Sequence, residues 1–317
     1  MPILKIETFY LPEGCGVKPF EGVLFFPVTP FAADGALDEK VLFEHIASGV
    51  AAGAGGVFAG CGTGEFHALS VAEVGACARA AVAAAAARVP VFGAAGGPLP
   101  LALEQAHAIA DAGADGLLLL PPYLVGAPQA GLLDYVRAIT GAVDLPVIFY
   151  QRGNAVLTPE TAAELASIPG VAGLKDGVGD LERLHRIVRR IRAVRPDFAF
   201  FNGLPTAELT APAYRGIGVS LYSSAVFAFA PEISLRFHRA LEEGDTATTG
   251  CLLDEFFVPL VELRHTSPGF AVSLVKAGVR LRGLDVGGVR APLSDPAPEH
   301  LAQLEKLIER GLELAAR

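Results

Sequence analysis

The sequence predicts an α/β protein, a (β/α)8 TIM barrel with a C-terminal helical extension. Eight short apolar segments recur at intervals of 21 to 35 residues, and each interval has room for one helix and two loops. Most of these segments are continuous apolar runs, which is typical of parallel strands buried on both faces. The chain has 317 residues, more than the roughly 250 that a complete barrel needs. Even spacing without a large insertion favours the closed barrel over a doubly wound open sheet.

Signals for the starts and ends of helices lie between the eight predicted strands. The strands are expected at residues 23–28, 56–60, 91–94, 116–120, 147–150, 172–175, 198–201 and 219–222. Ser70 and Glu73 form a capping box, and Thr158 followed by Pro159 places proline at the first helical position. Asp180 is expected to cap another helix. Glycines stand where helices should end, at Gly53, Gly113 and Gly216.

After residue 222 the pattern changes to helical segments without a further convincing strand. The first segment, at 231–243, completes the eighth strand–helix unit. Further helices are expected near 246–265, 270–281 and 299–315. The expected organisation is a lead-in segment (1–20), a catalytic barrel (21–244) and a C-terminal helical extension packed on the barrel (245–317).

Composition indicates a cytoplasmic protein without nucleic-acid or membrane partners. Hydrophobic residues make up 52% of the chain and charged residues 19%, which is enough apolar material for a large core. The net charge of −9 leaves no basic stripe for nucleic acid or anionic membranes. No apolar run reaches the roughly 20 residues that span a bilayer, and the N-terminus lacks the features of a signal peptide. Because the net charge of the chain is negative, an anionic substrate would need positively charged side chains at its binding site.

The spacing of metal-binding residue types indicates no metal site. The seven histidines form neither HxH nor HExxH, and the acidic residues form no ligand cluster. The four cysteines form no CxxC pair, so neither a disulfide framework nor a zinc ribbon is suggested. We therefore expect a metal-independent enzyme rather than a metal-dependent enolase-type or amidohydrolase-type barrel.

Reactive groups of such barrels lie at the C-terminal ends of the strands. Lys175 closes the apolar run 171–174, so its amine is expected in a confined site where burial lowers its pKa. A neutral amine attacks a ketone to form an imine, whereas the alternative is a lysine that leaves the strand end for solvent. Tyr150 ends the neighbouring strand, and its phenol can transfer protons to the carbinolamine. This pairing favours the imine interpretation, although Tyr150 alone would also fit a core aromatic residue.

Two features predict that a substrate carboxylate is bound. The loop after the second strand fails as a nucleotide loop, because it lacks a third glycine and a GK[ST] sequence. As an anion cradle it fits, since Gly62 lets backbone N–H groups approach an anion and Thr63 adds a hydroxyl donor. Arg152 can bind a carboxylate bidentately, or else forms a surface salt bridge. Glu65 is expected to anchor the loop rather than to catalyse, and Cys61 is expected to pack.

Several motifs, taken in order, resemble the dihydrodipicolinate synthase/N-acetylneuraminate lyase superfamily. They are Pro27-Val28-Thr29-Pro30-Phe31 with Asp34-Gly35 and Asp38, Gly62-Thr63-Gly64-Glu65, Tyr150, and Lys175-Asp176. The resemblance extends from about Gly22 to Leu293. Within the superfamily, the sequences at 64–66 (Gly64-Glu65-Phe66), 150–158 and 175–180 are most similar to the 5-dehydro-4-deoxyglucarate dehydratases.

This resemblance implies an activity and a set of site residues. The activity is a decarboxylating dehydration of 5-dehydro-4-deoxy-D-glucarate, a keto-deoxy sugar diacid of D-glucarate catabolism, to 2,5-dioxopentanoate, water and CO2 through a lysine Schiff base. The implied catalytic residues are Lys175, Tyr150 and Thr63. The substrate-binding residues are expected to be Gly62 and Thr63, for the carboxylate next to the ketone, and Arg152, Asn202 and Ser223, for the distal hydroxyls and carboxylate. No metal or organic cofactor is expected, because the iminium accepts the electrons, and a homotetramer is expected because family members are commonly tetramers.

Two departures from the superfamily pattern bear on the choice of activity. Dihydrodipicolinate synthases usually read GTTGE, whereas Gly62 replaces the first threonine here. They also carry a Tyr-Tyr pair after the fourth strand, where this chain reads Pro122-Tyr123-Leu124. Both departures weaken the synthase and aldolase interpretations. The alternatives left open are a 2-keto-3-deoxy sugar acid aldolase, a 4-hydroxy-tetrahydrodipicolinate synthase-like enzyme, and a non-catalytic keto-acid-binding barrel.

Overall fold

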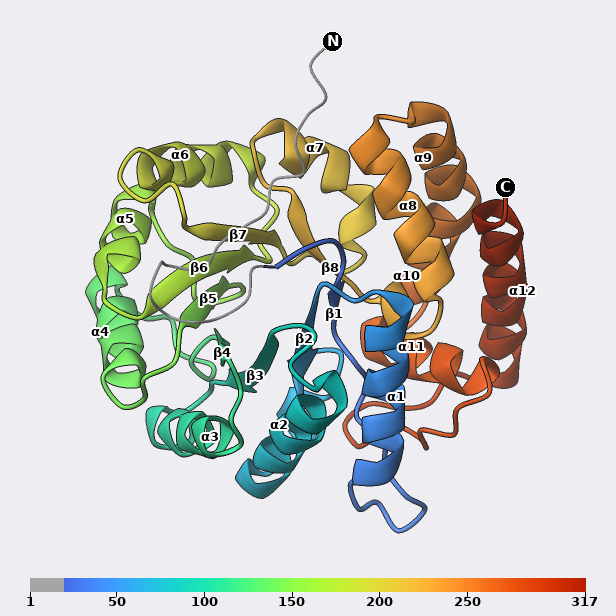
Figure 1. Cartoon of the computed structure of the whole chain (residues 1–317), viewed down its shortest axis with the longest axis horizontal. Helices are drawn as coiled ribbons and strands as arrows, with labels where there is room; N and C mark the ends of the chain where they lie inside the picture. Colours follow the sequence, from blue (N-terminus) through green and yellow to red (C-terminus); the bar gives the residue numbers. More distant parts are fainter. Residues whose placement is uncertain (1–19) are drawn as a thin grey trace.

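The computed structural model describes residues 20–317, and these form the predicted barrel. Each strand pairs in parallel with the next along the chain, and β8 pairs with β1 to close the sheet (Figure 1). The strands are β1 (Leu24–Phe25), β2 (Gly56–Ala59), β3 (Val91–Ala95), β4 (Gly116–Leu119), β5 (Val147–Gln151), β6 (Val171–Asp176), β7 (Ala199–Asn202) and β8 (Leu221–Ser224). The predicted lead-in segment, apart from Phe20, lies outside the described residues.

Helices alternate with the strands and surround the barrel in Figure 1. They are α1 (Glu39–Ala52), α2 (Val71–Ala85), α3 (Leu99–Asp111), α4 (Gln129–Thr140), α5 (Pro159–Ser167), α6 (Leu181–Arg192), α7 (Ala211–Gly216) and α8 (Pro231–Glu243). Short 3-10 turns lie in the loops after β2, β7 and β8, namely η1 (Phe66–Ala68), η2 (Ala207–Leu209) and η3 (Val226–Ala228).

The capping signals read from the sequence are formed in the structure. Ser70 and Glu73 make the reciprocal bonds of a capping box, and Thr158 and Asp180 cap α5 and α6. Gly53 caps α1 with a φ of 109°, a conformation that favours glycine. The prediction for Gly216 is confirmed, because Gly216 is the last residue of α7; Gly218, with a φ of 85°, makes the turn that follows.

The first strand is shorter than predicted. We expected residues 23–28, but only Leu24–Phe25 form β1. Pro27 has no N–H to donate to a neighbouring strand, so the ladder ends before it. The shortened strand leaves residues 26–31 free to run over the C-terminal end of the barrel.

Phenylalanine rings fill the interior of the barrel. The ring of Phe20 packs against Phe58, Phe92 and Phe201 at centroid distances of 5.6, 5.2 and 5.3 Å. Leu24, on β1, belongs to the same buried cluster. Close-packed rings exclude water from this part of the barrel, so polar chemistry is confined to the C-terminal ends of the strands.

The C-terminal extension is helical, as predicted. It contains α9 (Thr246–Leu252), a π-helical turn η4 (Leu253–Phe257), α10 (Val258–His265), α11 (Phe270–Leu281) and α12 (Pro298–Ala315). The π-helical turn interrupts the helix predicted at 246–265. Pro259 lacks the N–H that a regular helix needs at this point, and a π turn accommodates the missing bond.

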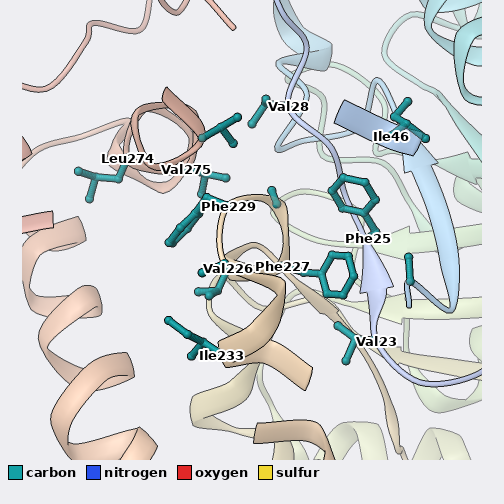
Figure 2. Packing of buried hydrophobic residues seen from close by; sticks show 14 of the residues in the cluster. Val23, Phe25, Val28, Ile46, Val226, Phe227, Phe229, Ile233, Leu274 and Val275 are labelled. Carbon is teal, nitrogen blue, oxygen red and sulfur yellow. The ribbon is translucent and has the colours of Figure 1, made fainter. Parts of the chain in front are cut away.

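The extension packs against the side of the barrel formed by α1 and α8. Figure 1 shows α11 beside α1, with α12 outermost. Figure 2 shows Leu274 and Val275 of α11 next to Phe229, in a cluster that reaches Phe25 of β1 and Val23 just before it. Barrel and extension therefore share one hydrophobic core, and α10 and α11 reach the strand ends where a site is expected.

Three properties of residues 20–317 concern membranes, metals and disulfides. None of the helices in this range is both long and apolar enough to cross a membrane. The same range holds no group of three or more His, Cys, Asp and Glu placed to bind a metal ion. Its cysteines, Cys61, Cys77 and Cys251, are free thiols.

Candidate active site

A cavity of about 170 Å³ opens at the C-terminal ends of the strands. Its lining consists of residues in or after β4, β5, β6, β7 and β8, residues in the loops after β1 and β2, and residues of α10 and α11 in the extension. The lining contains six of the predicted site residues: Gly62, Thr63, Tyr150, Arg152, Lys175 and Ser223. The fold thus brings together side chains that lie up to 161 positions apart in the sequence.

Lys175 is buried at the base of this cavity. Its side chain is 5% exposed, and its Nζ lies 3.8 Å from the ring centroid of Phe26 and 4.7 Å from that of Tyr150. No hydrogen bond or ion pair to this amine is formed within residues 20–317. The pKa of Lys175 is lowered to about 7, mainly by burial; Cys61 opposes this shift and the charge of Arg152 adds to it. A substantial fraction of the amine is therefore neutral and nucleophilic at neutral pH.

Tyr150 lies beside Lys175 because β5 and β6 pair in register, with Tyr150 opposite Lys175. The Tyr150 hydroxyl donates a hydrogen bond to the carbonyl oxygen of Gly203 at 2.8 Å. Burial raises the pKa of Tyr150, so the phenol stays protonated at neutral pH. A protonated phenol next to the amine can give a proton to the leaving hydroxyl of a carbinolamine.

Two glycines make room for this pair. A Cβ at Gly203 would lie 2.5 Å from Cε of Lys175, and a Cβ at Gly177 would lie 2.8 Å from Cε2 of Tyr150. Atoms this close overlap, so any side chain at either position would displace the catalytic group. Both glycines directly follow strands, and the sequence analysis gave them no role. The sequence signal that could have identified them is a glycine directly after a strand that ends in a polar residue.

Asp176, the residue after Lys175, holds the strand end from the outer side. Its carboxylate is 1% exposed and accepts hydrogen bonds from Gln151 Nε2 at 2.6 Å and from the Tyr214 hydroxyl. It also accepts bonds from the backbone N–H groups of Val178 and Gly179. Because the loop after β6 is fixed in this way, Lys175 has a defined position at the base of the cavity.

The loop after β2 is anchored from three sides. The Thr29 hydroxyl donates to the carbonyl oxygen of Gly64 at 2.6 Å. The Glu65 carboxylate accepts from Lys276 Nζ at 2.7 Å and from the backbone N–H of Arg290 at 2.8 Å. These contacts agree with the interpretation of Glu65 as an anchor. They leave Thr63 half-buried on the cavity wall.

Cys61, at the start of the same loop, packs rather than reacts. The side chain is fully buried, and its thiol lies 3.6 Å from the carbonyl oxygen of Ala59. Burial raises the pKa of the Cys61 thiol to about 12. A thiol with such a pKa is protonated at neutral pH and is a poor nucleophile.

Asn202 lies outside the cavity lining, in contrast to the prediction that it binds substrate. It is fully buried, and its Nδ2 donates to Thr210 Oγ1 at 2.8 Å and to the Ala207 carbonyl oxygen at 3.1 Å. Its Oδ1 accepts from the backbone N–H of Leu204. Asn202 pairs in register with Asp176, so its side chain points outward and shapes the loop after β7.

Arg264 is a lining residue that the sequence analysis missed. It lies in α10, is half-buried, and donates to Thr206 Oγ1 at 2.7 Å. Site residues of a barrel are expected at strand ends, and no local sequence pattern marks an arginine within a helix as part of a site. Among residues 20–317, the lining holds the guanidinium groups of Arg152 and Arg264 besides the amine of Lys175, and no Asp or Glu. The cavity is therefore positively charged although the net charge of the chain is −9.

The chain is similar to known proteins over most of its length. The model of the dihydrodipicolinate synthetase family matches residues 19–311. A Streptomyces coelicolor protein named "Probable 5-dehydro-4-deoxyglucarate dehydratase 1" is 59% identical over 292 residues, which cover 92% of each chain. A Streptomyces griseus protein with the name "Probable 5-dehydro-4-deoxyglucarate dehydratase" is 56% identical over 307 residues, which cover 96% of each chain.

A solved structure extends this comparison to the fold. A prophage protein of the dihydrodipicolinic acid synthase family from E. coli K12, solved in complex with pyruvate, is 27% identical to this chain. The TM-score is 0.81, and the match covers 92% of this chain and 98% of the other. Because the family model and these relatives match nearly the whole chain, the protein belongs to the dihydrodipicolinate synthetase family.

Proposed function

We propose that the protein is a decarboxylating dehydratase that converts 5-dehydro-4-deoxy-D-glucarate to 2,5-dioxopentanoate, water and CO2. The names of relatives that are 56% and 59% identical support this substrate. The observation that carries the chemistry is the buried amine of Lys175, which has no charged partner in the described part of the chain and lies beside Tyr150 in a cationic cavity. The pyruvate bound to the E. coli relative supports a keto acid as ligand.

The reaction begins with the attack of neutral Lys175 on the ketone of the substrate. Tyr150 protonates the carbinolamine hydroxyl, which leaves as water and gives an iminium. The iminium acidifies the adjacent CH2. Loss of a proton there and of the β-hydroxyl, which together form water, gives a conjugated iminium.

The same electron sink then drives decarboxylation. The bond to the distal carboxylate breaks, CO2 leaves, and the electron pair moves into the conjugated iminium. Protonation and hydrolysis release 2,5-dioxopentanoate and restore Lys175. No metal ion or organic cofactor is needed, because the iminium accepts the electrons. Thr63 and the backbone at Gly62 would hold the carboxylate next to the ketone.

Product analysis tests this function. Purified protein is incubated with 5-dehydro-4-deoxy-D-glucarate, and CO2, 2,5-dioxopentanoate and pyruvate are measured together. The proposal expects CO2 and the dioxo acid in equal amounts without pyruvate. Release of pyruvate would instead identify an aldolase. Binding of the keto acid with neither turnover nor a borohydride-trapped adduct would identify a non-catalytic keto-acid-binding barrel.

The rate should depend on the protonation of Lys175. Its pKa of about 7 means that kcat/KM should rise from pH 5 to pH 7 and level off near pH 8. At pH 5 only about 1% of the amine is neutral, so a loss of roughly two orders of magnitude is expected. Arg152→Gln removes a charge that lowers this pKa and should move the rise to higher pH. A profile that is flat from pH 5 to 8 would contradict the role of a neutral Lys175.

Tyr150→Phe should lower kcat by about 10²- to 10³-fold, the usual contribution of one acid–base group. The ring, and therefore the packing beside Lys175, is retained. Tyr135→Phe is a matched control, because the buried Tyr135 also donates to a glycine carbonyl, that of Gly97 at 3.0 Å, but lies outside the cavity lining. The control should lose less than about threefold in kcat. Equal losses of kcat in both variants would mean that Tyr150 contributes through packing and not through proton transfer.

We also propose that the enzyme acts in the cytoplasm as a homotetramer. The resemblance to a family of common tetramers supports this assembly. Light scattering of the purified protein at micromolar concentration tests it, and a monomer would contradict it.

A further inference from the structure

Arg264 is a guanidinium on the cavity wall without an acidic partner. Its side chain is half-buried and lines the cavity, and no carboxylate of residues 20–317 lies within salt-bridge distance of it. Burial lowers the pKa of Arg264, which shows that the guanidinium has lost solvent without gaining a counter-charge. Half-buried arginines elsewhere in the fold are paired, as Arg215 is with Glu242 and Arg290 with Glu73.

The guanidinium of Arg264 is held in place by two contacts, which do not use all of its N–H donors. Thr206 Oγ1 accepts a bond from Nη1 at 2.7 Å, and the His265 ring lies 2.9 Å from Nη2. Thr206 has a φ of 53°, a conformation that a β-branched residue rarely adopts. Of the five N–H donors of Arg264, three are left for a ligand. A guanidinium in this state is prepared to bind a carboxylate through two parallel bonds.

Arg264 and Arg152 occupy different parts of the cavity. Arg152 lies 6.0 Å from the Tyr150 ring, and its charge lowers the pKa of Lys175, so it acts at the ketone end. Arg264 comes from α10, is bonded to Thr206 in the loop after β7, and is not among the charges that shift the pKa of Lys175. Leu260 and Leu274 of the extension also line the cavity.

We propose that Arg264 binds the carboxylate of the substrate that lies farthest from the ketone, so that the C-terminal extension selects keto diacids over keto monoacids. This inference rests on the proposed function, because it assigns the distal end of that substrate. The barrel strands supply the group that reacts with the ketone, and the extension supplies the group that recognises the far end.

The chemistry predicts how Arg264 should act in turnover. As CO2 leaves, the negative charge of the carboxylate moves toward the iminium. A cation on that carboxylate therefore stabilises the bound substrate more than the transition state of this step. Arg264→Gln should raise KM by about 10- to 100-fold and change kcat by less than about threefold.

A binding experiment tests the inference without turnover. 2-Oxoadipate and 2-oxohexanoate have six carbons and the same ketone, but only the first carries a distal carboxylate. Neither has a β-hydroxyl to eliminate. Calorimetry on the full chain should show that 2-oxoadipate binds about 10- to 100-fold more tightly. In Arg264→Gln this ratio should fall to about one to three, while the affinity for pyruvate stays within about twofold.

Three further variants make the test specific. Arg152→Gln should weaken pyruvate binding and keep the diacid preference. Arg264→Lys should keep part of the preference, because the charge remains and the fork is lost. Thr206→Val removes the hydroxyl that holds Arg264 and should lower the ratio in part, which tests the site even if Arg264→Gln does not fold.

The outcomes separate this inference from the proposed function. A diacid preference that survives in Arg264→Gln, or that is absent in the wild type, would overturn the inference. Loss of the preference in Arg152→Gln alone would also overturn it. Absence of CO2 from the deoxy-keto-glucarate would refute the proposed reaction, whereas the binding ratio would still decide on Arg264.

Discussion

Substituting alanine for Lys175 should abolish the decarboxylating dehydration, with a loss in kcat of at least about 10⁴-fold. Without the amine no iminium forms, and neither the CH2 proton nor the CO2 has an electron sink. Within residues 20–317 no other lysine lines the cavity, so no neighbouring amine of this range can replace it. CO2 release measures the loss. Mass spectrometry after borohydride reduction with pyruvate should show an adduct on the wild type and none on the variant.

The unfolding temperature of Lys175→Ala serves as a control, because the direction of its change can be predicted. Lys175 is buried without a hydrogen bond or ion pair to any residue that the structure describes, and burying such a group costs free energy. Lys175→Ala should therefore unfold at the same temperature as the wild type or at a higher one, as expected where function is kept at the expense of stability. Full activity in this variant would remove the mechanism. Unfolding at a much lower temperature would make the loss of activity uninformative.

The part of the site that could be predicted is the part that sits on the strands. Lys175 and Tyr150 end apolar runs, and the C-terminal ends of parallel strands meet in a barrel. Thr63 follows a strand in the same way, so its place on the cavity wall required only strand positions. Local sequence was sufficient for these residues, because the barrel topology brings the C-terminal ends of its strands together.

Register explains the error at Asn202. The sequence predicts which residues lie at a strand end. Whether a side chain faces the inside or the outside of the barrel depends on how neighbouring strands align. Asn202 aligns with the outward Asp176, and Phe201 aligns with the inward Lys175. A shift of one residue reverses the two faces. The sequence carries no direct signal for this alignment, so Asn202 and Ser223 looked equally suitable.

Arg264 and Lys276 could not be predicted for a different reason. Both lie on helices of the extension, and each acts through a partner far away in the sequence. Arg264 is 58 positions from Thr206, and Lys276 is 211 positions from Glu65. The pattern that placed their helices concerns only which face is apolar. A charged residue that is buried against another element looks the same in sequence as one that faces solvent.

The ion pair between Glu65 and Lys276 connects the substrate loop to the extension. Both side chains are fully buried, with Nζ of Lys276 2.7 Å from Oε1 of Glu65 and 4.0 Å from the ring centroid of Phe31. Lys276→Met fills a similar volume but leaves the Glu65 carboxylate without its cation. Removing one partner of a buried pair costs about 3–5 kcal/mol. The unfolding temperature should fall by roughly 6–15 °C in a thermal melt.

Two variants separate the cost of the lone charge from the cost of lost packing. Glu65→Gln combined with Lys276→Met removes both charges, while the amide oxygen can still accept from the backbone N–H of Arg290. The double variant should recover at least about 2 kcal/mol relative to Lys276→Met. Lys306→Met, at an exposed position, should change stability by less than about 0.5 kcal/mol. If the double variant is as unstable as Lys276→Met, the charge of Glu65 is not the cause.

The same variants connect stability to substrate binding. Glu65 has a φ of 58°, which a residue other than glycine keeps only when its contacts hold it there. Without Lys276 the loop should relax, and Thr63 should lose its fixed place on the cavity wall. Lys276→Met should therefore raise the dissociation constant for pyruvate at temperatures well below its unfolding transition, and the double variant should restore much of the affinity. An unchanged pyruvate affinity in Lys276→Met would mean that the loop after β2 does not depend on this ion pair, so that the pair stabilises the fold without organising the site.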